Sequence, residues 1–359
     1  MLILLRRSGK KKGVCLMRSI FSSFVLVVSF LIALCSGYAQ PPSNQQADTT
    51  SQCVVDATWP KKPERFEWAQ MPGITLDDRD QVYIFTRSRP TVQVYKTDGT
   101  FVRAWDSGDF SGAHYIRIGP KGNIWTANIA DHVVRKHSPE GKLLLTIGQV
   151  GVAGADHEHF DKPTDMAVLP SGDIFVSDGY GNRRVVHFDA KGRYVNEWGQ
   201  EGNQPGQFAL PHAIVADSKG RLYVADRENA RVQVFDAKGK LLAVWENIVT
   251  PWGLWMTKNQ ELWVCGSSCF KKEGTDEHIV LPPQDQVLMK LSLKGKVLQR
   301  IPLPKTAVPP GKPGELDWIH TVAFDSQGNL YLGDIQGKRA QKFRLKLKPR
   351  MNTNNHQNE

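Results

Sequence analysis

Cysteine is scarce in this chain of 359 residues, which has five cysteines, and only Cys53, Cys265 and Cys269 lie beyond residue 39. No further cysteine or histidine stands at zinc-finger spacing from them, which argues against a structural zinc site built on thiolates. Cys265 and Cys269 lie four residues apart, across Gly-Ser-Ser, and could close a small loop in an exported protein. The sequence leaves the pairing of the three cysteines open.

Acidic residues are absent from residues 1–39, which carry six of the ten net positive charges of the chain. An apolar run from Ile20 to Leu34 follows these basic residues, and Gly37-Tyr-Ala39 fits a signal-peptidase site. We therefore expect residues 1–39 to be a signal peptide and the protein to be periplasmic or extracellular, with membrane attachment only if the signal is uncleaved. The rest of the chain has a net charge of about +4, which removes the main support for nucleic-acid binding.

Within the remaining chain, one short phrase of two apolar runs joined by a turn recurs six times, as in Ala213-Ile-Val-Ala-Asp followed by Arg221-Leu-Tyr-Val-Ala-Asp. In every copy we call the position eight residues before the turn glycine, or before the residue equivalent to it, the slot. The slots, in chain order, are Gly73, His114, Thr164, His212, Gly253 and His320. They lie 41 to 67 residues apart, close to the roughly 40 to 50 residues of a propeller blade with its loops.

Most copies continue into a second hairpin with a glycine turn. The turn glycines are Gly99, Gly141, Gly192, Gly239 and Gly295. Four short strands per unit predict a single all-β domain, a six-bladed β-propeller over residues 61–348, which we expect to be monomeric. We expect residues 40–60 to form a flexible leader and residues 349–359 a polar tail. An insertion spans about residues 266–283, and the segment Arg65–Ala69 is the candidate strand that closes the ring.

Alternate copies carry histidine in the slot, at His114, His212 and His320. The first strand of each blade lines the central channel, so equal register gives equal height along the axis. Three histidines from alternate blades of six would converge on one axial point. Three imidazoles with an open fourth position are typical of a catalytic zinc site. The alternative is that these histidines only form hydrogen bonds in the channel, and their shared register favours the metal.

The chain then resembles the peptidyl-α-hydroxyglycine α-amidating lyase family, six-bladed propellers of the NHL-repeat type. The resemblance is strongest from Phe160 to Phe235. It rests on Ser177-Asp-Gly-Tyr180, Pro211-His212 and Ala225-Asp-Arg-Glu-Asn229. The phrase Gly-Asn-Leu-Tyr-Val is shared by NHL propellers in general and indicates only the fold.

The resemblance implies a zinc ion on His114, His212 and His320, a catalytic tyrosine at Tyr180 and functional arginines at Arg87 and Arg227. The tyrosine and the two arginines follow the slot residues of their own blades by 14 to 16 positions, where the second strand of each blade ends on one face of the ring. The implied reaction splits a carbinolamide into an amide and glyoxylate, with Tyr180 as the base and the arginines on the substrate carboxylate. The alternative for each arginine is a structural pair with Asp178 or Asp226.

The chain departs from the family at several positions. Gly181 and Tyr223 stand where cysteines are expected, and Trp318 replaces a methionine. Thr321 replaces an acidic residue that the family uses to bind calcium. Backbone carbonyls of Ile74 and Ile116 remain as candidate calcium ligands, and two neutral carbonyls would bind the ion weakly.

The sequence also allows a second function, in which the protein is a non-enzymatic exported propeller that binds a protein or a glycan. This hypothesis predicts no tightly held zinc. A lactonase-like hydrolase ranks below both, because no axial set of Asp or Glu appears. The lyase function requires a peptide or small molecule with an α-hydroxyglycine-like end. The ring leaves no room within the chain for a hydroxylase domain, so this substrate would be supplied from elsewhere.

Overall fold

A computed structural model describes residues 52–271, 278–279, 282–308 and 311–346. The expected signal peptide, residues 40–51 of the expected leader and the expected polar tail lie outside these residues. Within the described ranges, no helix is long and apolar enough to cross a membrane. All described strands belong to the unit Tyr38–Glu359.

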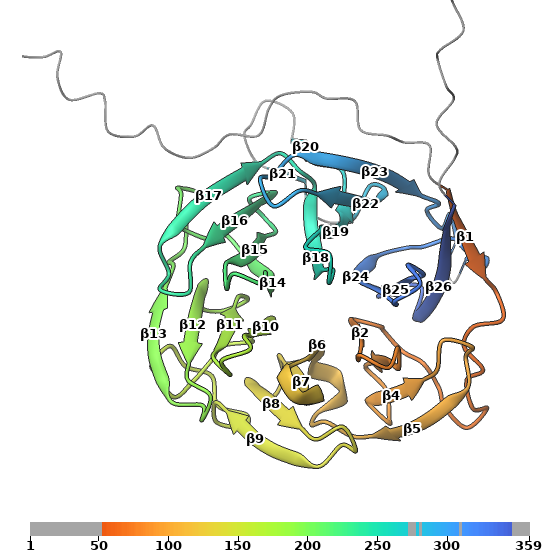
Figure 1. Ribbon diagram of the computed structural model, residues 1–359, viewed down its shortest axis with the longest axis horizontal. Coiled ribbons are helices and arrows are strands. Elements are labelled where there is room, and N and C mark those ends of the chain that lie inside the picture. Colours follow the sequence, from red (N-terminus) through yellow and green to blue (C-terminus); the bar gives the residue numbers. More distant parts are fainter. Residues whose placement is uncertain (1–51, 272–277, 280–281, 309–310, 347–359) are drawn as a thin grey trace, which may run out of the picture. The chain divides into compact units, whose positions relative to one another are not determined.

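Six antiparallel four-stranded sheets stand around a central axis as the blades of a propeller (Figure 1). Blade 1 contains β2 (Gly73–Leu76), β3 (Val82–Phe85), β4 (Val92–Tyr95) and β5 (Phe101–Trp105). Blade 2 contains β6 (Ala113–Ile118), β7 (Ile124–Asn128), β8 (Val133–His137) and β9 (Leu143–Ile147). Blade 3 contains β10 (Asp165–Val168), β11 (Ile174–Asp178), β12 (Arg184–Phe188) and β13 (Tyr194–Trp198).

The second half of the ring repeats this order, with each first strand nearest the axis. Blade 4 contains β14 (Pro211–Ala216), β15 (Leu222–Asp226), β16 (Arg231–Phe235) and β17 (Leu241–Glu246). Blade 5 contains β18 (Thr250–Met256), β19 (Leu262–Ser267), β22 (Gln286–Leu291) and β23 (Val297–Leu303). Blade 6 contains β24 (Ile319–Phe324), β25 (Leu330–Asp334), β26 (Arg339–Lys346) and β1 (Gln52–Asp56). The prediction of an all-β, six-bladed propeller is confirmed.

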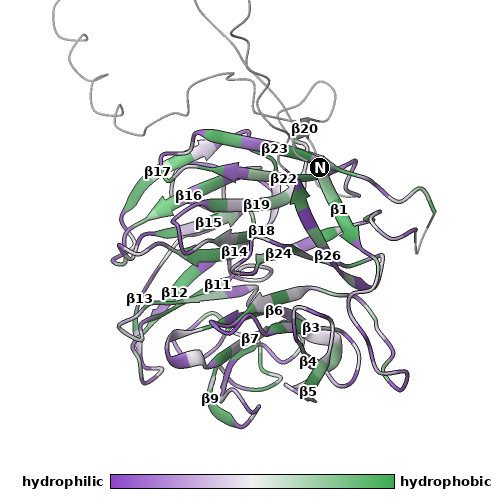
Figure 2. Ribbon diagram, turned by 45° about the vertical axis from the view of Figure 1, so that its right-hand side comes forward, coloured by the Kyte–Doolittle hydropathy of each residue, from purple (hydrophilic) through white to green (hydrophobic). Residues whose placement is uncertain are grey.

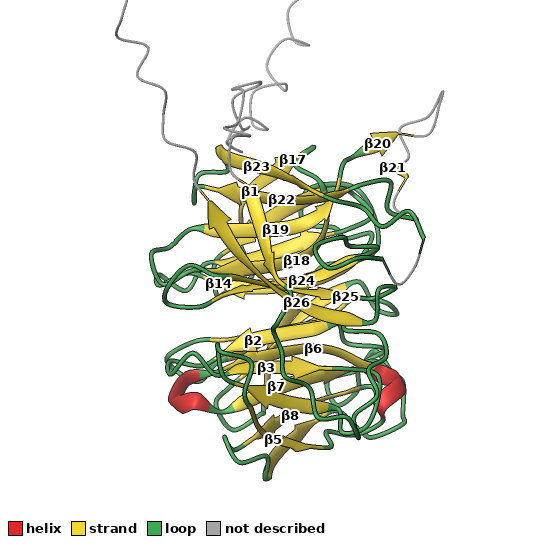
Figure 3. Ribbon diagram, turned by 90° about the vertical axis from the view of Figure 1, so that its right-hand side faces the viewer, coloured by secondary structure: helices red, strands yellow, loops and turns green. Residues whose placement is uncertain are grey.

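Burial follows the distance of each strand from the axis. Every residue of β2 and β11 is buried, whereas β13 on the rim alternates between half-buried and exposed side chains. Inner strands are enclosed by neighbouring blades on both faces, so their sequences are continuous apolar runs. Figure 2 shows hydrophobic residues mainly on the strands, which also carry hydrophilic residues, and largely hydrophilic loops between them. Figure 3 shows that helix is confined to short segments, which are the 3₁₀ turns η1 (Phe110–Gly112) and η2 (Pro120–Gly122).

The outer hairpins also join neighbouring blades. The five predicted turn glycines all have positive φ, from 79° to 95°, as a tight turn requires. A Cβ at Gly239 would lie 2.7 Å from the ring of Trp198, which ends the outer strand of the preceding blade. Gly141 meets Trp105 in the same way, and Gly295 meets Trp245. The repeated glycine therefore serves both the turn and the contact between blades.

The prediction that Arg65–Ala69 closes the ring is wrong. β1 pairs with β26 instead, with Cys53 opposite Leu345 and Val55 opposite Phe343, and Figure 1 shows the two strands side by side. Cys53 and Val55 pack on the apolar cluster of blades 5 and 6, which accounts for the choice of this strand. The propeller therefore begins within the expected leader, at Gln52. The Arg65–Ala69 segment packs on blade 1, where the Trp68 indole donates to Gln93 Oε1 at 2.9 Å.

The insertion lies between the second and third strands of blade 5, and its described part includes the short strands β20 (Phe270–Lys271) and β21 (His278–Ile279). Within the described residues, Cys53 and Cys265 form no disulfide. Cys265 is buried in β19, and burial raises the pKa of its thiol to about 12.

Candidate metal centre and its cavity

The three slot histidines meet at the axis. His114, His212 and His320 lie near the starts of β6, β14 and β24, and each is 0% to 3% exposed. Their ring centroids are 4.8 to 4.9 Å apart, and one ring nitrogen from each lies within 4.8 Å of the other two. The structure therefore brings together the three residues that equal register placed at one height.

Backbone carbonyls of the following blade orient each imidazole. His114 Nδ1 lies 2.7 Å from the Thr164 carbonyl oxygen, and His212 Nδ1 lies 2.6 Å from that of Trp252. His320 Nδ1 lies 2.8 Å from the Pro72 carbonyl oxygen. A carbonyl only accepts, so in each ring the proton is assigned to Nδ1, and the Nε2 lone pair is free to bind a metal.

Burial also keeps the triad uncharged. It lowers the pKa of His320 to about 3, and it holds the pKa of His114 and of His212 well below the usual value. Positive charge on Arg87 and Arg227 acts in the same direction. The imidazoles are therefore in the neutral form that a metal ligand requires near neutral pH.

These donors fit zinc. Three neutral imidazole nitrogens that converge with their second nitrogens anchored form the donor set of a three-histidine zinc site. No protein carboxylate or thiolate joins them among the described residues, which leaves a coordination position for substrate or water.

Tyr180 reaches the same point from blade 3, two residues beyond β11. Its hydroxyl oxygen lies 3.1 Å from His114 Nε2 and 3.3 Å from His212 Nε2. The phenol oxygen is thus beside the nitrogens that would hold the metal, within reach of any group bound there.

Two arginines flank this tyrosine. Arg87 Nε donates to the Ala113 carbonyl at 3.0 Å, and Arg87 Nη1 donates to Gln70 Oε1 at 2.6 Å. Both partners are neutral, and no carboxylate in the described part of the chain forms an ion pair with Arg87. Burial lowers the pKa of this guanidinium, and the neighbouring Tyr180 opposes the shift. Arg87 is half-buried, and a partly desolvated cation without a carboxylate partner favours an anionic ligand.

Arg227 is 5% exposed and stacks over the ring of Trp252, with its Cζ atom 4.9 Å from the ring centroid. Its Nη2 donates to Glu228 Oε1 at 3.0 Å, and its Nε has no partner within the described protein. Asp226 pairs instead with Arg231, as Asp178 pairs with Arg184. The alternative hypothesis, that Asp178 or Asp226 pairs with the site arginines, is therefore wrong.

A cavity of about 220 Å³ opens beside the triad. It is lined by Gln70, Arg87, Tyr180, Arg227, Trp252, Trp318, His320, Ile335 and Gln336. The indole nitrogens of Trp252 and Trp318 are buried without a hydrogen-bond partner in the described protein, as is Arg227 Nε. Unpaired buried donors are costly, about 1 to 3 kcal/mol each, so this cluster favours a ligand rich in acceptors.

Sequence reasoning missed Gln70, Trp252 and Glu228 as members of the site. Trp252 could have been found, because it stands directly before the slot residue Gly253. Gln70 and Glu228 carry no comparable signal, since their role depends on contacts with the arginines.

The residues proposed as calcium ligands contribute only neutral oxygen atoms. The Thr321 hydroxyl donates to the Ile74 carbonyl at 3.4 Å, which satisfies one of the two carbonyls that were candidate ligands. A hydroxyl and carbonyls supply no negative charge, whereas calcium sites in proteins depend on carboxylates.

Comparisons with known proteins agree with this fold. The NHL repeat family model matches residues 160–188 and 208–235, in blades 3 and 4. Peptidyl-alpha-hydroxyglycine alpha-amidating lyase 1 of Drosophila melanogaster is 37% identical over 143 residues, 36% of this chain and 26% of that protein. The human NHL repeat-containing protein 3 is 28% identical over 318 residues, 80% of this chain and 83% of that protein.

Several relatives are much longer than this chain. It spans between 14% and 37% of the length of the vertebrate peptidyl-glycine alpha-amidating monooxygenases that it matches. Among solved structures, a streptogramin B lyase matches with a TM-score of 0.55 at 14% identity, over 82% of this chain and 97% of that chain. This match shows the propeller fold alone. The sequence relatives support the predicted resemblance to the amidating lyases.

Proposed function

We propose that this chain is a zinc-dependent lyase that cleaves an α-hydroxyglycine-type carbinolamide into an amide and glyoxylate. The observation that carries the proposal is the placement of the Tyr180 hydroxyl within 3.1 to 3.3 Å of two Nε2 atoms of an anchored three-histidine set. The similarity to proteins named as amidating lyases supports the same reaction.

The cavity suits a small acid. Arg87 has no carboxylate partner among the described residues, and Arg227 has a free Nε beside the indole donors. A planar guanidinium binds a carboxylate through two parallel hydrogen bonds. The carboxylate of an α-hydroxyglycine end would therefore bind between the arginines, with its hydroxyl toward the triad.

The reaction needs one proton removed and one delivered. A zinc ion on the triad would polarise the substrate hydroxyl and lower the barrier to its deprotonation. Tyr180, acting as the phenolate, takes the hydroxyl proton, the C–O bond becomes the carbonyl of glyoxylate, and the C–N bond breaks. The resulting Tyr180 phenol returns this proton to the departing amide nitrogen, so the products are a primary amide and glyoxylate. Buried walls formed by Trp252 and Ile335 limit the access of water.

Glyoxylate release from N-benzoyl-α-hydroxyglycine by the zinc-loaded protein tests this reaction. We expect turnover in the wild type and a loss of about 10²- to 10⁴-fold in kcat for Tyr180→Phe, which removes the proton acceptor. Tyr194→Phe, on the rim strand β13, is the matched control and should keep full activity. Absence of glyoxylate above the uncatalysed rate, with zinc bound, would rule out this substrate class.

A binding function without catalysis is the second candidate. It is favoured by the match to NHL repeat-containing protein 3, which covers 83% of that protein's length and whose name states no enzymatic activity. This function predicts that the triad holds no zinc and that Tyr180→Phe changes no measurable reaction.

We also propose that the protein is exported, on the composition of residues 1–39. Fractionation of the producing cells should place the chain outside the cytoplasm with residues 1–39 removed. A full-length cytoplasmic chain would contradict export.

A further inference from the structure

A buried ion pair crosses the channel below the histidine triad. Arg117, on β6, donates from Nε to Asp165 Oδ1 at 3.0 Å and from Nη2 to Asp165 Oδ2 at 2.5 Å. Arg117 is 8% exposed and Asp165, on β10, is 0% exposed. Two parallel hydrogen bonds between a guanidinium and a carboxylate form the strongest type of protein ion pair.

The pair links four of the six blades. Arg117 Nη1 donates to the Leu254 carbonyl on β18 at 3.0 Å. The Ile214 backbone N–H on β14 donates to Asp165 Oδ2 at 2.9 Å, and the Met166 N–H donates to Oδ1 at 2.8 Å. The carboxylate therefore has four donors, and the guanidinium contacts two blades other than its own. Burial raises the pKa of the Asp165 carboxyl, and the guanidinium and both backbone N–H groups oppose that shift.

The guanidinium occupies a defined level of the ring. Its partners Asp165 and Leu254 each stand one residue after a slot, at Thr164 and Gly253. Thr321 and Ile74 hold the same register position in blades 6 and 1. This is the level at which the family resemblance implies calcium, where the Thr321 hydroxyl already donates to the Ile74 carbonyl.

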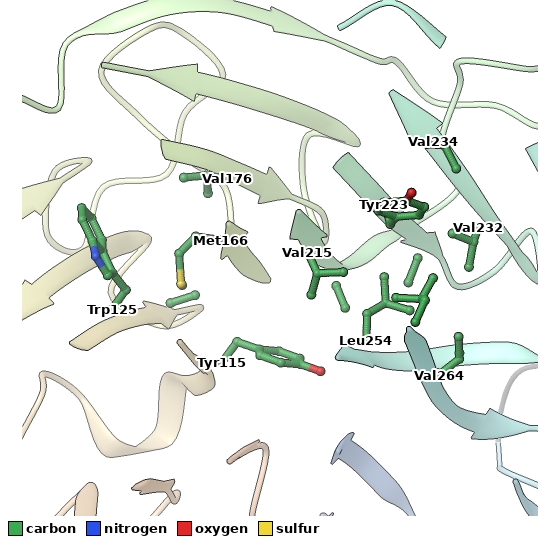
Figure 4. Packing of buried hydrophobic residues seen from close by; sticks show 14 of the residues in the cluster. Tyr115, Trp125, Met166, Val176, Val215, Tyr223, Val232, Val234, Leu254 and Val264 are labelled. Atoms are coloured by element: carbon green, nitrogen blue, oxygen red, sulfur yellow. The ribbon is translucent and has the colours of Figure 1, made fainter. Parts of the chain in front are cut away.

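Tyr115 covers the pair on the side of the triad. The Arg117 Cζ atom lies 4.5 Å from the centroid of the Tyr115 ring, and the Tyr115 hydroxyl donates to the His320 carbonyl at 3.4 Å. Figure 4 shows Tyr115 extending from β6 toward the strand that carries Leu254. A separate hollow of about 190 Å³, on the far side, is lined by Arg117, Met166 and Ile214 among others. Tyr115 and the ion pair therefore separate the histidine triad from this hollow.

We propose that the guanidinium of Arg117 is the cation of the ring at the level of Asp165 and Leu254, so that the propeller closes without a calcium ion at that level. Arginine carries its charge at every physiological pH and is covalently attached to the chain. Calcium, in contrast, needs six to eight oxygen ligands including carboxylates to hold it. Asp165 is already engaged by the guanidinium, which would also repel a second cation at the same level. This inference is independent of the lyase reaction.

Thermal unfolding of the full chain at defined metal content tests the inference. Calcium is removed on a chelating resin, about 5 mM is added back to half of each sample, and zinc is measured in every sample so that a change at the triad is recognised. This calcium concentration exceeds the dissociation constants of weak extracellular calcium sites. The set contains the wild type, Arg117→Met, Arg117→Lys and the double variant Arg117→Met with Asp165→Asn.

The wild-type Tm should be the same with and without calcium. Arg117→Met leaves Asp165 buried without its cation, so its Tm should fall by about 5 to 15 °C. Calcium should recover part of that loss, because the carboxylate is free to bind it, and should recover none in the double variant. A wild-type Tm that rises with calcium as much as that of Arg117→Met would overturn the proposal.

Arg117→Lys keeps the test decisive if Arg117→Met does not fold. A lysine retains the charge but cannot donate to both carboxylate oxygens and to Leu254 in the same geometry. We expect a smaller loss of Tm than for Arg117→Met. A Tm equal to that of the wild type would show that the bidentate guanidinium is not required, and would overturn the proposal.

Discussion

Alternate blades contribute different chemistry from the same register position. Blades 2, 4 and 6 supply His114, His212 and His320, while the slots between them hold Gly73, Thr164 and Gly253. The intervening blades present the carbonyls that accept from each Nδ1, because they bring Thr164, Trp252 and Pro72 against the rings. All six blades therefore position the triad, although only three of them carry the histidines.

Gly253 provides the space that this arrangement requires. A Cβ there would lie 2.5 Å from the Tyr115 hydroxyl oxygen and 2.6 Å from the His320 carbonyl oxygen. Gly253→Ala should therefore lower the free energy of unfolding by about 1 to 3 kcal/mol, since both neighbours are fixed in the core. Urea denaturation measures this change. Gly73→Ala, whose Cβ would be no nearer than 3.0 Å to any atom, should cost less, and the reverse order would contradict this packing.

Lysine should not replace Arg87 in binding the substrate carboxylate. Its Nε and Nη1 are committed to Ala113 and Gln70, so only the rest of the fork can meet a substrate carboxylate. Arg87→Lys should raise KM for the α-hydroxyglycine substrate about 10- to 100-fold, because a single ammonium cannot keep these bonds and bind the acid. Initial-rate kinetics give the value. Arg193→Lys, with 73% of the arginine side chain exposed, is the control and should leave KM unchanged.

At the scale of elements, the repeat predicted most of the architecture. Apolar runs, turn glycines and slot spacing gave the order of strands in five blades, because each blade uses local hairpins. The sixth blade could not be completed in this way, since β1 and β26 are joined only by the closed ring. The short apolar run Cys53-Val54-Val55 was the available signal, and it stands directly after a polar segment of the sequence. Similarly, Arg117 and Asp165 pair across blades, and nothing local in the sequence marks them as partners.

β1 offers a matched test of ring closure. Val55 faces the core of blade 6, whereas its neighbour Val54 points outward and is 39% exposed. Val55→Asp should lower the free energy of unfolding by about 1 to 3 kcal/mol, because it places an unpaired carboxylate against apolar residues. Val54→Asp should change it by no more than about 0.5 kcal/mol. Equal effects in denaturant titrations would contradict the pairing of β1 as the closing strand.

For the whole molecule, buried histidines set the response to acid. Burial lowers the pKa of His137, on β8, to about 4, whereas an unfolded histidine titrates near about 6.5. Between these values the unfolded chain binds a proton that the folded chain does not, so the free energy of unfolding falls as pH falls. The triad histidines shift in the same direction.

His137→Gln isolates one part of this response. The variant should lose less stability than the wild type between pH 6.5 and pH 4.5, by about 1 to 3 kcal/mol, and should match its pH dependence above pH 7. Urea denaturation at each pH, on zinc-free protein, supplies the comparison. Parallel curves for the two proteins over this range would show that His137 is not held neutral by burial.

The stoichiometry of bound zinc tests the central claim most directly. Purified protein exposed to zinc and then desalted is analysed by mass spectrometry of the metal, beside His212→Ala and the control His157→Ala, which changes an exposed histidine. The wild type and the control should hold about one zinc per chain, because three anchored imidazoles bind the ion tightly, and His212→Ala should hold almost none. A folded wild type without zinc, or a His212→Ala variant that keeps it, would contradict the metal centre and leave a binding propeller.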